Sequence, residues 1–123
     1  FVSSAAGGPQ IYVMGLDGGG MKRITHAGSY NYGPDWGADG RIVFAGLEEG
    51  TSDIFVTTEG GDVERLTQNQ GSNKDPTWSP DGRYIAIVSR RSGGSGVYLM
   101  TADGRYQYMI RKVGGVSNVT WQP

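Results

Sequence analysis

The sequence repeats with a period of 42 to 44 residues, and this period restricts the fold more than any other feature. Tryptophan recurs at Trp36, Trp78 and Trp121, in steps of 42 and 43 residues. Three further columns keep this spacing: Phe1, Phe44 and Ile87; Tyr12, Phe55 and Tyr98; and Ile24, Leu66 and Ile110. A period of about 40 to 50 residues with only strand-like segments is typical of β-propeller blades.

Each repeat contains four segments with the composition of β-strands. In chain order they are a short tryptophan segment (35–36, 77–78, 120–121), an apolar run (1–2, 41–45, 84–89), a third strand (11–14, 54–57, 97–100) and a fourth (21–25, 63–67, 107–111). The near-continuous apolar run predicts burial on both faces, as in a blade between two neighbours. The fourth segment mixes apolar with charged residues, which protects an outer edge from pairing.

Short turns connect these segments. Glycine makes up 22 of the 123 residues, and Asp-Gly pairs recur between the strands, as tight turns require. We find no helical periodicity, linker or second domain. The sequence therefore predicts an all-β fold of three four-stranded propeller blades, at about 1–31, 32–74 and 75–116, with a closing strand at 117–123.

Composition excludes several kinds of partner. The net charge of −1 argues against a nucleic-acid binder, which would need a basic face. The longest apolar run, residues 84–88, is far shorter than the roughly 20 residues of a membrane span, so we expect no membrane insertion. The chain has no cysteine and therefore no disulfide framework.

Three blades are fewer than the usual four to eight and would leave two apolar flanks uncovered. The sequence starts within the second strand of a repeat and stops after a first strand, so its two ends are complementary. We therefore expect a second copy of the chain to complete a six-bladed ring around a two-fold axis. The alternative is that the remaining blades belong to a separate polypeptide or have been cut away.

The repeated motifs resemble those of the TolB-type propeller family. The fullest match is Pro76–Gly82, with the sequence PTWSPDG, followed by Ile85–Ser89. Gln10–Met14 with Arg23–Thr25, and Asp53–Val56 with Arg65–Thr67, repeat the same pattern.

The resemblance implies a periplasmic protein that binds the peptidoglycan-associated lipoprotein Pal at the mouth of a six-bladed propeller, within the Tol–Pal envelope system. The sequence departs from that family in lacking an N-terminal α/β domain and half of the blades. Two alternatives therefore stay open: a structural or engineered half-propeller that self-assembles without a native ligand, and a propeller fragment of a peptidase or lyase.

Polar residues that lead into the first strand of each repeat are the candidate binding residues, because the innermost strands of a propeller line its channel. These residues are Asn31, Tyr32, Asp35, Asn73, Lys74, Asp75, Ser117 and Asn118. We expect no cofactor. The alternative is calcium in the channel, because a ring of carboxylates and carbonyls there would suit this ion. His26 is the only histidine and no Gly-x-Ser-x-Gly motif is present, so we expect no enzymatic activity.

Overall fold

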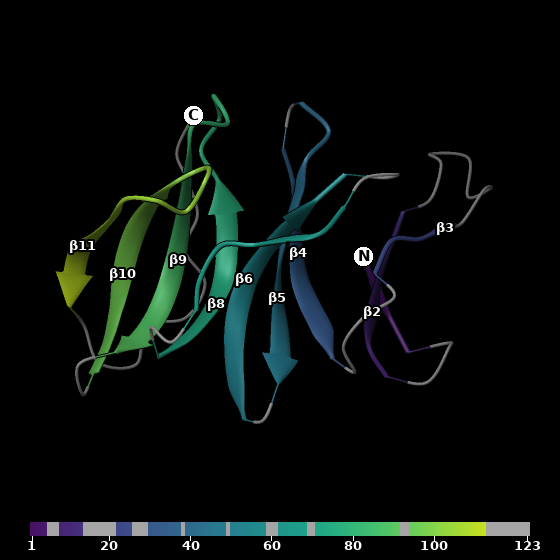
Figure 1. Cartoon of the computed structure of the whole chain (residues 1–123), viewed down its shortest axis with the longest axis horizontal. Coiled ribbons are helices and arrows are strands. Elements are labelled where there is room, and N and C mark those ends of the chain that lie inside the picture. Colours follow the sequence, from purple (N-terminus) through teal and green to yellow (C-terminus); the bar gives the residue numbers. More distant parts are fainter. Residues whose placement is uncertain are drawn as a thin grey trace.

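The chain forms three antiparallel β-sheets that stand side by side, as shown in the computed structural model (Figure 1). The structure describes residues 1–4, 8–13, 22–25, 30–37, 39–48, 50–58, 62–68, 71–91 and 94–112. No helix occurs within these ranges. The predicted all-β fold is confirmed.

We call the three sheets blades 1, 2 and 3. Blade 1 contains β1 (Val2–Ser3), β2 (Gln10–Val13) and β3 (Lys22–Arg23). Blade 2 contains β4 (Asn31–Trp36), β5 (Ile42–Glu48), β6 (Thr51–Thr57) and β7 (Glu64–Arg65). Blade 3 contains β8 (Ser72–Trp78), β9 (Tyr84–Arg91), β10 (Gly94–Thr101) and β11 (Gln107–Lys112). Strands that are consecutive in the chain are neighbours in each sheet, and the predicted closing strand lies outside the described residues.

The inner strands β4 and β8 are longer than the sequence predicts. They begin at Asn31 and Ser72, not at Asp35 and Thr77. The pairing register of β4 with β5 shifts between Tyr32 and Asp35, and that of β8 with β9 shifts at the corresponding place, between Lys74 and Thr77. A Pro in the middle of these segments suggests a loop, but the structure accommodates it in a β-bulge, where a ladder hydrogen bond is already missing.

Three Asp-Gly-Arg turns share one geometry. The Oδ1 atoms of Asp39, Asp81 and Asp103 accept a hydrogen bond from the backbone N–H two residues later, at 3.1, 3.1 and 3.0 Å. The intervening glycines have φ values of 89°, 73° and 76°, which favour glycine. These aspartates therefore act as the turn residues that the sequence predicts.

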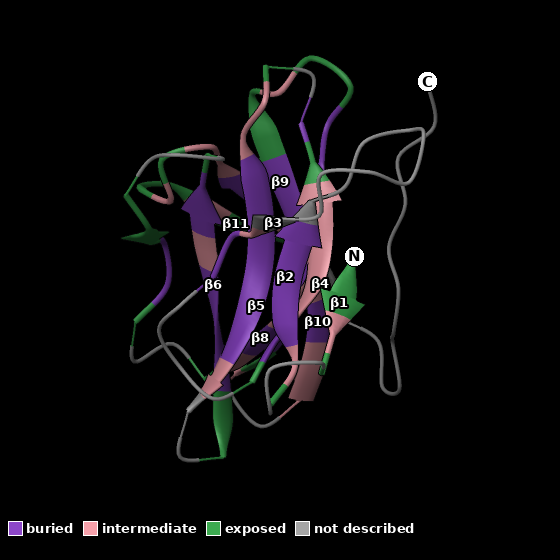
Figure 2. Cartoon of the chain, turned by 90° about the vertical axis from the view of Figure 1, so that its right-hand side faces the viewer, coloured by how far each residue is buried: buried purple, intermediate pink, exposed green. Residues whose placement is uncertain are grey.

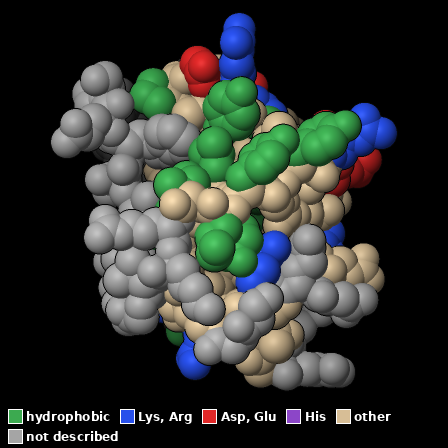
Figure 3. Space-filling model, turned by 90° about the vertical axis from the view of Figure 1, so that its left-hand side faces the viewer, with side chains coloured by type: hydrophobic (Ala, Val, Ile, Leu, Met, Phe, Trp, Pro, Cys, Tyr) green, Lys and Arg blue, Asp and Glu red, His purple; other side chains and the backbone are tan. Residues whose placement is uncertain are grey.

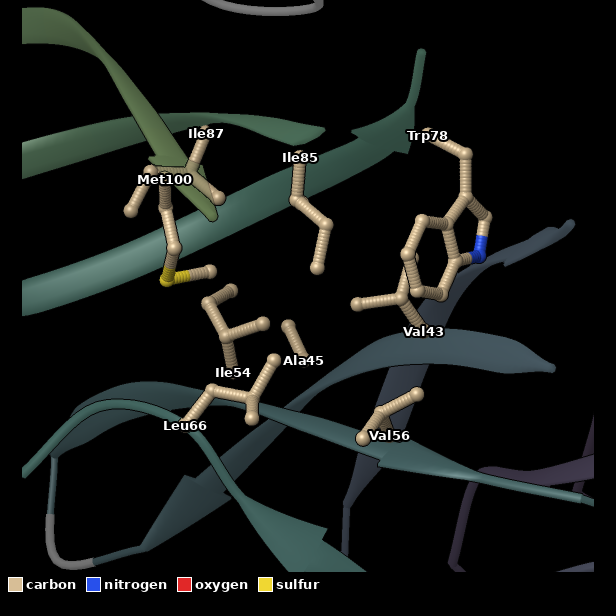
Figure 4. Packing of buried hydrophobic residues seen from close by; sticks show 9 residues of the cluster. All are labelled: Val43, Ala45, Ile54, Val56, Leu66, Trp78, Ile85, Ile87 and Met100. Carbon is tan, nitrogen blue, oxygen red and sulfur yellow. The ribbon is translucent and has the colours of Figure 1, made fainter. Parts of the chain in front are cut away.

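The core lies between the blades. Figure 4 shows the cluster that joins blades 2 and 3, and its members are Val43, Ala45, Ile54, Val56, Leu66, Trp78, Ile85, Ile87 and Met100. A second cluster joins blades 1 and 2 and consists of Ile11, Ile24, Ile42 and Phe44, packed against Phe55. Strand β5 supplies alternate residues to both clusters, so both of its faces are buried (Figure 2). The predicted burial of this apolar run is confirmed.

Arg41 connects blade 2 to blade 3. Its guanidinium lies over the Trp78 ring, 4.4 Å from the ring centre, and Nη2 donates a hydrogen bond to the Gly82 carbonyl at 2.9 Å. Such a cation–π contact adds a polar link to an interface that is otherwise held by apolar packing.

Candidate binding site on the inner strands

Six of the eight predicted binding residues lie on the inner strands β4 and β8 and not in loops that lead into them. Ser117 and Asn118 lie outside the described residues. On these strands, several of the six side chains form hydrogen bonds to a neighbouring blade or strand.

Asn31 and Asp35 link neighbouring blades. Asn31 is buried, and its Nδ2 donates to Oε1 of Gln10 in blade 1 at 2.7 Å. Asp35 Oδ2 accepts the backbone N–H of Trp78 at 2.6 Å and the hydroxyl of Thr77 at 3.2 Å. These contacts give both side chains a structural role between blades.

Asn73 is fully buried in blade 3. Its Oδ1 accepts a hydrogen bond from Nη2 of Arg91 at 3.0 Å. Its Nδ2 has no hydrogen-bond partner among the described residues, although burying an amide without a partner is costly. Asn73 therefore positions Arg91, which is not among the predicted binding residues.

Tyr32, Lys74 and Asp75 remain half-buried. The Tyr32 hydroxyl lies 2.6 Å from Oγ of Ser52, which fixes its ring. Asp75 has φ of 52°, and Gly33 has φ of 62° at the corresponding position of β4. Asp75 is the one non-glycine residue with positive φ in the described part of the chain.

Two threonines with the same position in the repeat organise polar networks at the outer strands. The Thr67 hydroxyl donates to Asp53 Oδ1 at 2.7 Å and accepts the N–H of Ile54 at 3.0 Å. Thr25 makes the equivalent bonds to Gln10 and Ile11, at 2.6 and 2.9 Å. The recurring Arg-x-Thr motif thus fixes β2 in blade 1 and β6 in blade 2.

The described residues contain no cluster of three or more His, Cys, Asp or Glu side chains able to hold a metal ion. Hydrogen bonds lower the pKa of three carboxyl groups, chiefly from the backbone of Arg41 at Asp39, from the hydroxyl of Ser79 at Asp81, and from the backbone of Arg105 at Asp103. All three belong to tight turns. In the part of the chain that the structure describes, no helix is long and apolar enough to cross a membrane.

The fold and its motifs agree with a known family, because the model of the TolB beta propeller domain, PD40, matches residues 1–123. The chain belongs to this TolB-type propeller family. No curated protein sequence matches the chain significantly.

Solved TolB structures are similar to this TolB-type chain. TolB from Acinetobacter baumannii superposes with a TM-score of 0.75 and 27% identity, over 91% of this chain and 28% of that protein. A putative TolB from Agrobacterium tumefaciens gives 0.82 and 28%, over 89% of this chain and 40% of that protein. The tricorn protease shares the fold, with 20% identity and a TM-score of 0.65. This match extends over 92% of this chain and 10% of the protease. The chain thus spans less than half of either TolB protein.

Proposed function

We propose that this TolB-type chain is a non-catalytic protein-binding module whose partner contacts the inner strand β8 at Lys74 and Asp75. The backbone of Asp75 is the observation that carries the proposal. Left-handed backbone costs an ordinary L-residue about 1–2 kcal/mol, and Asp tolerates it better than most. Blade 2 uses glycine at this position. Strained residues concentrate at functional sites, so an Asp at the position where blade 2 has glycine supports a role for its carboxylate.

The proposed partner is a Pal-like lipoprotein and the proposed location is the periplasm. Both proposals rest on the likeness to TolB proteins. Lys74 and Asp75 place a cation and an anion at consecutive, half-buried positions of β8, which suits recognition of a polar protein surface. Calcium at the channel stays a secondary prediction, in which the carboxylate of Asp75 would be one ligand.

Replacing Asp75 by glycine tests this proposal. Asp75→Gly keeps the backbone conformation and removes the carboxylate, so we expect unchanged or higher stability together with about tenfold weaker Pal binding. Asp62→Gly, at an exposed position before β7, is the matched control and should bind normally. Calorimetric titration with purified Pal gives the affinity. Equal affinity of the parent chain and Asp75→Gly would contradict the proposed contact.

A second candidate function is self-assembly, which two repeat columns support. Ile24 and Leu66 are each 7% exposed between blades, whereas Ile110, their counterpart in blade 3, is 59% exposed. Phe44 and Ile87 are buried, whereas Phe1, their counterpart in blade 1, is 48% exposed. Blade 1 thus exposes Phe1 and blade 3 exposes Ile110, although the counterparts of both residues are buried at interfaces between blades.

We infer that the occupant of the exposed blade 3 flank is blade 1 of a second copy, which would give a six-bladed ring. Figure 3 shows hydrophobic side chains gathered on this side of the molecule. The exposed hydrophobic residues of β11 are Tyr108, Met109 and Ile110. Within the chain, the stacked pair Phe44 and Phe55 covers Ile24. Phe1 and Tyr12 form a similar stack, 5.8 Å between ring centres, that could cover Ile110 of another copy.

Mass measurement in solution tests the second copy. We expect the mass of two chains for the parent, and of one chain for Ile110→Glu, because a charge would be buried in the interface. Val63→Glu, which alters an exposed apolar residue of blade 2, should leave the dimer intact. A single-chain mass for the parent chain at micromolar concentration would overturn the paired ring.

A further inference from the structure

Three arginines converge on a groove between blades 2 and 3. The groove has a volume of about 540 Å³. Its walls come from the end of β7 and the segment after it, from the end of β9, and from the turn before β11; the lining residues are Arg65, Leu66, Thr67, Gln68, Arg91, Gly104, Arg105 and Gln107. No acidic residue belongs to this lining.

The three arginines differ in how their charge is balanced. Arg65 forms an ion pair with the carboxylate of Asp53, so its charge is neutralised. Neither Arg91 nor Arg105 forms an ion pair with any residue that the structure describes. Arg91 therefore carries a half-buried positive charge without a carboxylate partner among the described residues, although such a charge is stable only when it is paired or well hydrogen-bonded. Arg105 adds an exposed positive charge that interacts with the carboxylate of Asp103.

Neutral groups hold the Arg91 side chain in place. Its Nε donates to Ser89 Oγ at 2.7 Å, and its Nη2 donates to Asn73 Oδ1 and Gln107 Oε1, both at 3.0 Å. The guanidinium also lies over the Tyr98 ring, 4.2 Å from its centre. Burial lowers the pKa of Arg91. These contacts fix the orientation of the guanidinium without cancelling its charge.

The repeat shows that the propeller architecture does not require this arginine. The residue 43 positions earlier, at the end of β5, is Glu48, of opposite charge. A residue needed for packing would keep its chemical type from blade to blade, as the isoleucines and phenylalanines of the interface columns do. The positive charge at the end of β9 is therefore not a constant feature of the repeat.

We propose that the groove between blades 2 and 3 binds an oxyanion, a carboxylate or a phosphate group, through Arg91 and Arg105. The hydrogen bonds to neutral groups use the Nε–H and both Nη2–H donors of Arg91. The two N–H groups of Nη1 are left to donate to the oxygens of either anion. Arg105 is exposed beside it and supplies a second positive charge. Neither Lys74 nor Asp75 lines the groove, so variants of the two proposed sites can be tested one at a time.

Titration of the intact chain with inorganic phosphate, at constant ionic strength in chloride, tests the site. Phosphate should shift the Arg91 Nε–H resonance and the backbone amides of Gln68 and Gly104 with one common affinity. A parallel titration with acetate distinguishes the two ligand groups: the tighter of the two anions identifies a phosphate or a carboxylate as the natural ligand group. Shifts spread over all surface arginines, with none specific to the groove, would overturn the proposal.

Arg105→Gln is the decisive variant, because the Arg105 side chain makes no hydrogen bond or ion pair with any residue that the structure describes, and its loss should leave the fold intact. We expect it to weaken anion binding about tenfold. Arg83→Gln is the matched control, since Arg83 is an exposed arginine outside the groove. Equal weakening by both variants would show that general surface charge attracts the anion, and would overturn the site.

Discussion

The backbone N–H of Trp78 donates a hydrogen bond to the carboxylate of Asp35 across 2.6 Å, from inner strand β8 to inner strand β4. The two residues are 43 positions apart, so this bond joins equivalent places in consecutive blades. The Thr77 hydroxyl reaches the same oxygen at 3.2 Å. Asp35 therefore links blades 2 and 3 through their inner strands, beside the apolar cluster that contains Val43 and Trp78.

Removing this carboxylate should destabilise the chain. Asp35→Ala leaves the N–H of Trp78 without its acceptor, and we expect the free energy of unfolding to fall by about 1–3 kcal/mol. Urea unfolding followed by tryptophan fluorescence measures the change. Asp62→Ala removes an exposed carboxylate and should be neutral. A loss as small as that of the control would show that the inter-blade bond contributes nothing.

The Thr67 hydroxyl should stabilise blade 2 more than its size suggests. Thr67→Val keeps the shape but deprives buried Asp53 of a donor and the Ile54 N–H of an acceptor. We expect a loss of about 1–3 kcal/mol in the free energy of unfolding. Thr58→Val, at an exposed position directly after β6, is the control. If both variants unfold at the same urea concentration, the network is not needed for stability.

Two glycines with similar backbone angles should respond differently to alanine. A Cβ at Gly71 would meet the Arg90 carbonyl oxygen at 2.1 Å, whereas a Cβ at Gly40 would meet no atom within 4 Å. Both variants incur the left-handed cost of about 1–2 kcal/mol. Gly71→Ala should also force the start of β8 away from β9, so its melting temperature should fall further. Equal melting temperatures would contradict the predicted clash.

The turn aspartates should make stability depend on pH in the acid range. The pKa of Asp81 in the folded chain lies below its ordinary 3.8, because the hydroxyl of Ser79 and then the N–H of Arg83 donate to the ionised form. This stabilisation is complete above the unfolded pKa and is lost as pH falls through the folded pKa.

Asp81→Asn isolates the contribution of one turn. Urea unfolding from pH 7 to pH 2 should show a smaller acid-induced loss in Asp81→Asn than in the parent chain. The other turns, at Asp39 and Asp103, remain as internal references, since their pKa values are lowered in the same way. Identical pH profiles for variant and parent would show that the turn does not favour the ionised carboxyl.

The repeat columns allowed the fold to be predicted from sequence. Phe44 and Leu66 sit in columns of apolar residues, and the structure places each at an interface between blades. The starts of β4 and β8 could not be predicted this way. Gly33-Pro34 and Asp75-Pro76 have the composition of turns, but tertiary pairing keeps them within strands as bulges.

The candidate site was harder to predict than the fold. Asn31, Asp35 and Asn73 are polar residues near the channel, which suggested binding, yet their polar atoms bond to neighbouring strands. Arg91 was missed because its partners Asn73 and Gln107 lie 18 and 16 residues away. The exchange of Glu48 for Arg91 within one repeat column is the sequence feature that could have indicated it.

Each sheet of this chain is completed by strands that follow one another directly along the polypeptide. A recombination event between Arg65 and Ser72 would therefore cut between two complete ladders and interrupt neither. Duplicating or deleting one repeat at the gene level adds or removes a whole sheet while leaving the pairing of the others unchanged. Chains built in this way can change their number of blades during evolution without first passing through an unfolded ancestor.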